Sequence, residues 1–183
     1  EHRDIAGFQV RDGQVEPLTL IQGRGSGTFA ASHRYMDDNP TGTPSDTYTI
    51  KVTATDDDSG VGVAQASVVV NNVAPAITSL TVTSPINENE RATLEGAFTD
   101  AGTLDVHTIY IDWGDGSPAE SVVLSVGARS FSKTHQYLDD NPTGTPSDNY
   151  VIHAKVGDDD TGADAKDVTV KVNNVAPAIT SLT

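Results

Sequence analysis

Residues 135–162 read HQYLDDNPTGTPSDNYVIHAKVGDDDTG, and residues 33–60 read HRYMDDNPTGTPSDTYTIKVTATDDDSG. These two stretches open a match of 48 residues at a constant offset of 102, in which about 30 positions are identical. A repeating unit near 100 residues has the size of a whole β-sandwich domain and exceeds the usual solenoid repeat. The match therefore predicts tandem domains that share one fold.

Each copy closes with the same junction, Asn-Asn-Val-Ala-Pro, at residues 71–75 and 173–177. A proline at this position cannot donate to a strand ladder, and it stiffens the connection. We therefore expect a complete domain over 74–175 and a partial domain over 1–73 that lacks its first strands. Residues 176–183 are expected to begin a following repeat or to serve as a strand-donating tail.

Alternation of apolar and polar residues predicts seven short strands in the complete domain. The predicted strands cover residues 77–82, 91–98, 107–113, 121–126, 130–137, 150–156 and 168–172. The earlier copy repeats the last two strands over 48–54 and 66–70. Seven strands separated by turns favour two sheets packed face to face, so the predicted fold class is all-β, with tandem Ig-like antiparallel β-sandwiches.

The composition argues against several classes of function. The chain has 26 acidic and 11 basic residues, with a formal net charge of −15. Such a field repels nucleic acid and anionic membranes, so no nucleic-acid partner is expected. A run of 18 apolar residues is absent, so no membrane span is expected either. Cysteine is absent, which excludes disulfides, thiolate metal sites and a cysteine nucleophile.

Several motifs of the complete domain belong together. Residues 112–117 read DWGDGS, His135 and Tyr137 form an H-x-Y pair, an Asp-rich turn covers 158–162, and the domain closes on V-x-V-N-N-x-A-P. This combination resembles the polycystic-kidney-disease (PKD) domain family over the whole domain. The resemblance implies an Ig-like sandwich, an extracellular or cell-surface location, a spacer, adhesive or accessory role, and no catalytic residues. The first copy departs from it, because residues 10–14 read VRDGQ and contain no Trp.

The acidic loops are the candidate metal sites. Calcium binds six to eight oxygen ligands with loose geometry, which suits clustered carboxylates. The candidate ligands are Asp37, Asp38, Asp100, Asp105, Asp139, Asp140, Asp158, Asp159 and Asp160. On an Ig-like sandwich these loops fall at two opposite ends, so we expect calcium to stiffen the domain junctions, with Asp46 near the first pair. The alternative is that Asp, Asn, Gly, Pro and Ser simply form good turns.

Other reactive side chains have simpler interpretations. Trp113 is expected to cap the core beside its Gly-rich turn. His135 and its repeat His33 are expected to be strand residues whose rings hydrogen-bond a neighbouring turn. Nearly all aromatic residues fall on strand positions of one parity, with Tyr110 the least certain, which leaves none for a flat sugar-binding platform. No sequence pattern places a nucleophile beside an oxyanion hole, so the chain is not expected to be an enzyme.

Two functions remain open. The first is a structural or adhesive array, a fibre or stalk, in which the tail over 177–183 pairs with the incomplete domain of another copy. The expected partners are then further copies or repeats of the chain. The second is an accessory spacer of a secreted hydrolase that binds polysaccharide or protein, with surface glycans as partners.

Overall fold

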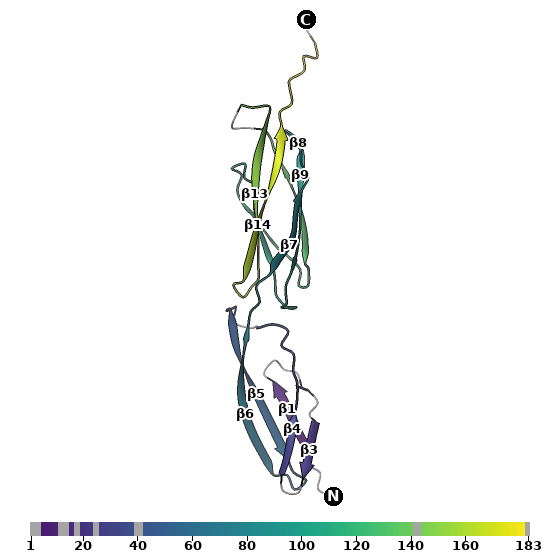
Figure 1. Ribbon diagram of the computed structural model, residues 1–183, viewed down its shortest axis with the longest axis vertical. Coiled ribbons are helices and arrows are strands. Elements are labelled where there is room, and N and C mark those ends of the chain that lie inside the picture. The colour runs from purple at the N-terminus through teal and green to yellow at the C-terminus, as the bar shows by residue number, and fades with distance from the viewer. Residues whose placement is uncertain are drawn as a thin grey trace. The chain divides into compact units, whose positions relative to one another are not determined.

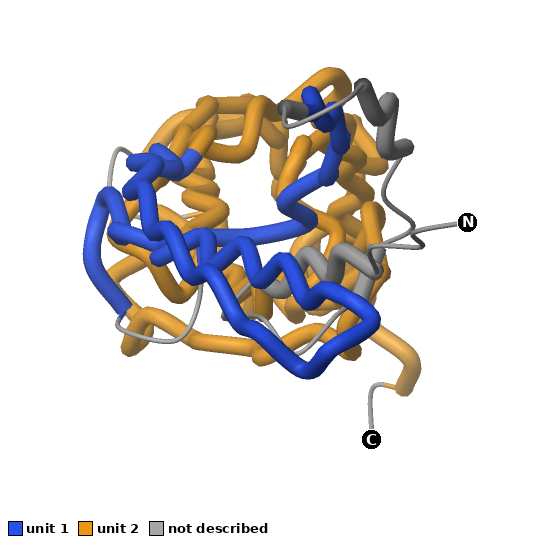
Figure 2. Tube along the Cα trace, turned by 90° about the horizontal axis from the view of Figure 1, so that it is seen from below, with its two compact units in different colours: residues 1–72 blue, residues 73–183 orange. Residues whose placement is uncertain are grey.

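The computed structural model describes residues 5–10, 15–16, 19–23, 26–38, 42–140 and 144–181. By its internal contacts the chain divides into two compact units, Glu1–Asn72 and Val73–Thr183. Figure 1 shows the strands of both units, and Figure 2 distinguishes the units by colour. No helix in the described part of the chain has the length and apolar character needed to cross a membrane.

The second unit is a sandwich of two sheets. One sheet has the order β11-β10-β13-β14-β8, and the other has the order β12-β9-β7. The strands are β7 (Ala76–Val82), β8 (Ile86–Asn87), β9 (Arg91–Thr99), β10 (Thr108–Asp112), β11 (Glu120–Val123), β12 (Ser130–Gln136), β13 (Ser147–Gly157) and β14 (Ala163–Asn173). Neighbouring strands are antiparallel, except that β14 pairs with β8 in parallel. The predicted all-β, Ig-like sandwich is confirmed.

The core lies between the two sheets of the second unit and follows the predicted alternation. Alternate residues of each central strand point inward, because successive side chains of a strand face opposite sides. The buried residues on β9, β13 and β14 are Ala92, Leu94, Phe98, Tyr150, Ile152, Ala154, Val156, Val170 and Val172. Apolar burial of this kind supplies the main stabilisation of a small sandwich that has no disulfide.

Several strands differ from the prediction; β14, for example, begins at Ala163 instead of residue 168. β13 begins at Ser147, so Ser147 and Asp148 pair with β14 instead of lying in a loop. β11 ends at Val123, because a turn with a hydrogen bond from the Ala128 N–H to the Ser125 oxygen follows it. The short strand β8 was not predicted, since a strand of two residues is too short to show alternation.

The first unit repeats the long hairpin of the second. Its larger sheet has the order β2-β1-β5-β6, from β1 (Ile5–Val10), β2 (Val15–Glu16), β5 (Ser45–Thr55) and β6 (Val61–Asn71). Strands β3 (Thr19–Gly23) and β4 (Ser26–Ala30) form a separate hairpin. The register of β5 with β6, Ser45 opposite Asn71, equals that of β13 with β14, Ser147 opposite Asn173. Residues 11–14, which belong to the stretch that departs from the family turn motif, lie outside the described residues.

Candidate functional site

The hairpin of β13 and β14 defines two ends of the second unit. Its pairing runs from Gly157 opposite Ala163 to Ser147 opposite Asn173. We call the first the hairpin end, which carries the turn 158–162, and the second the linker end, from which residues 174–177 continue. The hydroxyl of Tyr150, near the start of β13, donates to the carbonyl oxygen of Asp139 at 3.1 Å. The predicted metal ligands of this unit therefore divide between the two ends.

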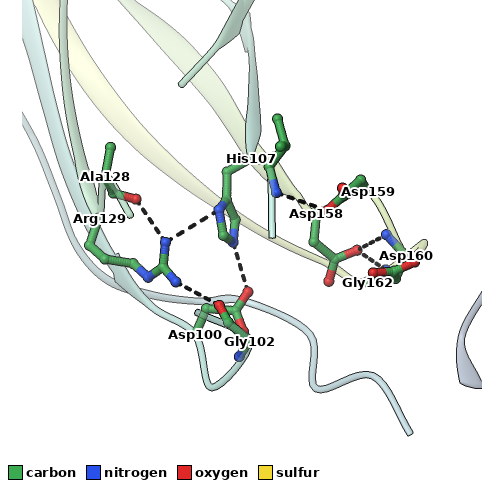
Figure 3. Close-up of polar contacts among 10 residues, drawn as sticks. Asp100, Gly102, His107, Ala128, Arg129, Asp158, Asp159, Asp160 and Gly162 are labelled. Carbon is green, nitrogen blue, oxygen red and sulfur yellow. Dashed lines mark hydrogen bonds and ion pairs between the residues drawn. The ribbon is translucent and has the colours of Figure 1, made fainter. Parts of the chain in front are cut away.

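At the hairpin end, Asp158 shapes the turn. Its Oδ1 accepts hydrogen bonds from the backbone N–H groups of Asp160 at 3.0 Å and Gly162 at 2.6 Å (Figure 3). The first unit repeats this arrangement, since Asp56 Oδ1 accepts from the N–H groups of Asp58 at 3.1 Å and Gly60 at 2.6 Å. An aspartate that bonds backbone two residues ahead is a common turn device. The turn-forming interpretation therefore describes Asp158 well.

A buried charge network lies beside that turn. His107 Nε2 is 2.7 Å from Asp100 Oδ2, and the two side chains are 1% and 0% exposed. Arg129 Nη1 approaches His107 Nδ1 at 3.5 Å, while its Nη2 donates to the oxygen of Gly102 at 2.7 Å (Figure 3). Because Nδ1 faces a cation, it is the acceptor, and Nε2–H donates to Asp100. Asp100 is thus balanced by partners of its own unit.

The remaining hairpin-end carboxylates gather around Asp105. Ligand atoms of Asp105, Asp159 and Asp160 lie within 4.8 Å of one another, and those of Asp100, Asp105 and His107 do the same. Asp105 belongs to both groups and is fully buried. Asp159 is also used structurally, since its Oδ1 accepts from the Val106 N–H at 2.9 Å. The structure therefore brings four of the five predicted residues of this end into two overlapping groups, and Asp158 lies in neither.

The linker end has its own group of carboxylates. Ligand oxygens of Glu88, Asp139 and Asp140 lie within 4.8 Å of one another. Asp140 is 8% exposed, and its Oδ2 accepts no hydrogen bond. Burial raises the pKa of the Asp140 carboxyl, and the negative charges of Glu88 and Asp139 raise it further. Glu88 Oε1 accepts from the Val175 N–H at 2.6 Å, so this group touches the outgoing linker.

Two residues of these groups, Glu88 and His107, were not predicted from the sequence. Neither has a repeated counterpart: residue 5 is Ile where His107 would repeat, and Glu88 precedes the part of the domain that the first copy contains. The available signal was the acidic stretch Asn87-Glu88-Asn89-Glu90, which fits a turn equally well. The Asn89 N–H donates to the Tyr137 oxygen at 2.6 Å, and the Tyr137 N–H donates to the Glu90 oxygen at 3.2 Å. These bonds place the turn beside the segment that follows β12.

The Gly-rich turn after β10 is structural. Trp113 is fully buried, and its Nε1 donates to Glu120 Oε1 at 2.9 Å. The ring of His135 stacks on Trp113, with centroids 4.8 Å apart, and its Nε2 lies 2.7 Å from Asp115 Oδ2. Burial by itself would raise the pKa of Asp115, but hydrogen bonds from Ser117 and His135 hold it below its ordinary value. The predictions for Trp113 and His135 are confirmed.

The first unit shows part of the same linker-end geometry. The hydroxyl of Tyr48 donates to the carbonyl oxygen of Asp37 at 3.2 Å, as Tyr150 does to Asp139. The segment that follows Asp38, residues 39–41, lies outside the described residues, as does its repeat over 141–143. Calcium binding by Asp37 and Asp38 therefore stays a prediction.

Two aromatic residues are more exposed than the other aromatic residues whose burial the structure describes. Phe98, Tyr137 and Tyr150 are buried, whereas Tyr110 is 48% exposed and Phe29 is 54% exposed. Lys155 Nζ lies 5.9 Å from the centroid of the Tyr110 ring. Phe29 lines an apolar groove of about 370 Å³ in the first unit; the other lining residues are Ala30, Ala31, Ile50, Val52, Ala64, Gln65 and Ala66.

Comparison with known proteins does not assign the chain to a family. No protein-family model matches the chain, and no curated protein matches it. A solved structure described as chicken CNTN1 FN1-FN3 domains is 13% identical, with 92% of this chain and 54% of that chain covered and a TM-score of 0.35. One described as mouse clustered PcdhgC3 EC1-3 is 13% identical, with 93% and 56% covered and a TM-score of 0.29. The chain spans about half the length of these structures.

Proposed function

We propose that this chain is a non-enzymatic, extracellular structural or adhesive spacer made of tandem Ig-like domains of the PKD type. The observation that carries the proposal is the duplication of one long hairpin, with equal register and the same Asp-stabilised turn, in units joined by a short proline-containing linker. A domain that is repeated in series adds length and stiffness, which is what a stalk or fibre requires.

The surroundings of the histidines support a non-enzymatic role. Each described His–Asp pair of the second unit holds structure together. His107 and Asp100 are buried at the hairpin end, and His135 and Asp115 close the Gly-rich turn. His153 and Asp167 pair across exposed positions of β13 and β14. None of these pairs orients a serine or threonine as a nucleophile in the described residues, which triad chemistry needs.

The PKD assignment rests on the core of the second unit. The buried Trp113, the stacked His135 and the Tyr137 hydroxyl, which donates to the Trp113 oxygen at 2.9 Å, connect the family's two motifs across the sandwich. These contacts give both motifs a structural purpose. The resemblance to PKD domains implies an extracellular or cell-surface location, and we propose that location for the spacer.

Calcium is the proposed cofactor. At the hairpin end the proposed ligands are Asp100, Asp105, Asp159 and Asp160, whose carboxylates supply the oxygen donors that calcium prefers. At the linker end they are Asp139 and Asp140, with Asp37 and Asp38 as the repeated positions in the first unit. A bound cation would offset the repulsion among these carboxylates and stiffen the ends of each domain.

Self-association by strand addition is the proposed mode of assembly. Residues 75–80 and 177–182 share the sequence PAITSL. In the first of these segments Ile77 is 4% exposed on β7, whereas its repeat Ile179 is 83% exposed. The apolar groove of the first unit, lined in part by Ile50 and Val52, is a receptor of suitable chemistry for such a segment. Another copy of the chain is therefore the proposed partner.

Electron microscopy of the purified chain, with calcium and with chelator, tests this function. We expect regular fibres in calcium and fewer or shorter fibres after chelation, with recovery when calcium is added back. A chain without residues 176–183 is expected to form none. Fibres that persist in this truncated chain would rule out strand addition. Dispersed particles of the full chain under both conditions would rule out self-assembly and leave a passive spacer.

The alternative function, an accessory module that binds glycans or protein, is favoured by one observation. Tyr110 is a half-exposed aromatic residue on a strand, beside Lys155, and such a ring can stack on a sugar. Sedimentation of the chain with insoluble polysaccharide distinguishes the two. Binding that is lost in Tyr110→Ala and kept in Tyr110→Phe would favour the accessory module.

A further inference from the structure

Three carboxylates from two separate loops converge at the linker end of the second unit. Glu88 lies in the turn between β8 and β9, whereas Asp139 and Asp140 follow β12. One oxygen from each lies within 4.8 Å of the others. The structure shows no lysine, arginine or histidine paired with any of the three in the described residues. Like charges at this separation repel unless a proton or a cation joins them.

A second observation concerns the Asp140 side chain. The Asp140 side chain is 8% exposed, and its Oδ2 has neither a hydrogen-bond donor nor solvent access. A buried carboxylate oxygen without a donor is unfavourable, because it has lost its hydration and gained nothing in return. The Asp140 carboxylate belongs to the group formed with Glu88 and Asp139. One side chain of this negatively charged cluster therefore carries a buried oxygen that no donor satisfies.

The donor set identifies the class of cation. All three donors are carboxylate oxygens, and the group contains no nitrogen or sulfur, which zinc and copper would favour. Calcium–oxygen distances are about 2.4 Å, so two oxygens on opposite sides of a calcium ion are about 4.8 Å apart. Oxygens that lie within 4.8 Å of one another can therefore reach one calcium ion. Calcium accepts carboxylates in flexible geometry, whereas magnesium demands near-ideal octahedral contacts, so calcium is the cation we favour.

The same glutamate also holds the linker. Glu88 Oε1 accepts from the Val175 N–H at 2.6 Å, and the Glu88 N–H donates to the Asn173 oxygen at 2.9 Å. The parallel pairing of β8 with β14, which places Ile86 opposite Val172, brings the two segments together. Any ion that fixes the Glu88 carboxylate therefore also fixes the first residues that leave the domain.

We propose that Glu88, Asp139 and Asp140 form a calcium site at the linker end, and that calcium bound there orders the linker through the hydrogen bond from Val175 to Glu88. This inference rests on the proposed calcium-dependent spacer. It adds a third ligand and a mechanism by which the ion acts on the segment that leaves the second unit.

Terbium luminescence of the full chain tests the site. The Tyr150 hydroxyl contacts the Asp139 backbone, so light absorbed by this ring is transferred to a Tb³⁺ ion held nearby. We expect calcium to displace this signal, and Glu88→Gln and Asp140→Asn each to weaken calcium binding at least about tenfold, since each removes a charged ligand. The matched control is Asp167→Asn, an exposed aspartate on β14, which is expected to bind calcium like the parent chain.

Amide hydrogen exchange tests the coupling. Calcium is expected to slow exchange of the Val175 N–H in the parent chain and to have no effect on it in Glu88→Gln. The glutamine keeps an oxygen that accepts the same hydrogen bond, so this variant is expected to retain the parent's melting temperature without calcium. If calcium binding is unchanged in both Glu88→Gln and Asp140→Asn, the proposed site is wrong. If calcium does not alter the exchange rate of the Val175 N–H in the parent chain, the proposed coupling is wrong.

A hairpin-end variant separates this inference from the wider proposal. If Asp105→Asn abolishes terbium binding while Glu88→Gln and Asp140→Asn leave it intact, the chain binds calcium at the hairpin end. The calcium-dependent spacer then stands, and the linker-end site is wrong. If no variant and no parent chain binds terbium or calcium, both are wrong.

Discussion

Two His–Asp pairs with equal separation differ in their surroundings. Asp115 and His135 lie 2.7 Å apart with side chains 18% and 16% exposed, and Asp167 and His153 lie 2.7 Å apart with side chains 60% and 59% exposed. Exposed ion pairs contribute little, because water screens them and the side chains lose freedom. We therefore expect Asp115→Asn to lower the free energy of unfolding by about 1–2 kcal/mol at pH 7, and Asp167→Asn by less than about 0.5 kcal/mol.

The Asp115 pair also predicts a pH dependence. Although burial opposes it, hydrogen bonds from Ser117 and His135 lower the pKa of Asp115 in the folded state from its ordinary value of 3.8. A carboxyl with a depressed folded-state pKa stabilises the fold fully above its unfolded pKa, and this contribution is lost as the pH falls through the folded pKa. The parent and Asp115→Asn should thus converge in stability below about pH 4. Urea unfolding of both proteins at pH 7 and at pH 3 measures this convergence. A stability difference between the parent and Asp115→Asn that is the same at both pH values would contradict the prediction.

At the scale of elements, the Gly-rich turn fixes β10 against β13. Gly114 has a φ of +75°, and a Cβ built there would lie 2.3 Å from the Val151 oxygen. Gly116 has a φ of +83°, but a Cβ there would meet no atom within 4 Å. We expect Gly116→Ala to destabilise the domain by about 1 kcal/mol through backbone strain alone. Gly114→Ala must also displace β13, so we expect a loss of about 3 kcal/mol.

Urea unfolding compares the two glycine variants. If the dependence of the unfolding free energy on urea concentration is the same in both, the difference in midpoint gives the difference in stability. Equal losses would show that strand displacement contributes nothing. An altered slope in Gly114→Ala alone would indicate that β13 detaches in the native state.

At the scale of the whole molecule, the two units bury the same repeat position differently. Ile152 is fully buried between the sheets of the second unit, whereas Ile50, its counterpart at an offset of 102, is half-buried beside the groove of the first. We expect Ile152→Ala to cost about 3–4 kcal/mol and Ile50→Ala about 1 kcal/mol, since a fully enclosed side chain leaves a larger cavity when it is truncated. Scanning calorimetry checks this. Equal losses in both units would contradict the difference in packing.

Much of the second unit was predictable from local pattern. The inward face of β13, the buried Trp113 and the bond from His135 to its turn follow from alternation and from turn chemistry, which act over a few residues. Candidate ligands were predictable by residue type, but their partners were not. Glu88 and His107 gave no periodic or repeated signal, and the sequence alone does not show that Asp158 is occupied by backbone N–H groups.

The tandem repeat, the all-β class and most strands of the complete domain were predictable from the sequence, because each depends on spacing along the chain. Which loops meet depends instead on the arrangement of the strands in space. The parallel pairing of β14 with β8 places Glu88 against Val175. The backbone bonds of Tyr137 to Asn89 and Glu90 place Glu88 beside Asp139 and Asp140. Strand order across a sandwich governs such contacts, and alternation within a strand, which reports only its inward face, contains no information about that order.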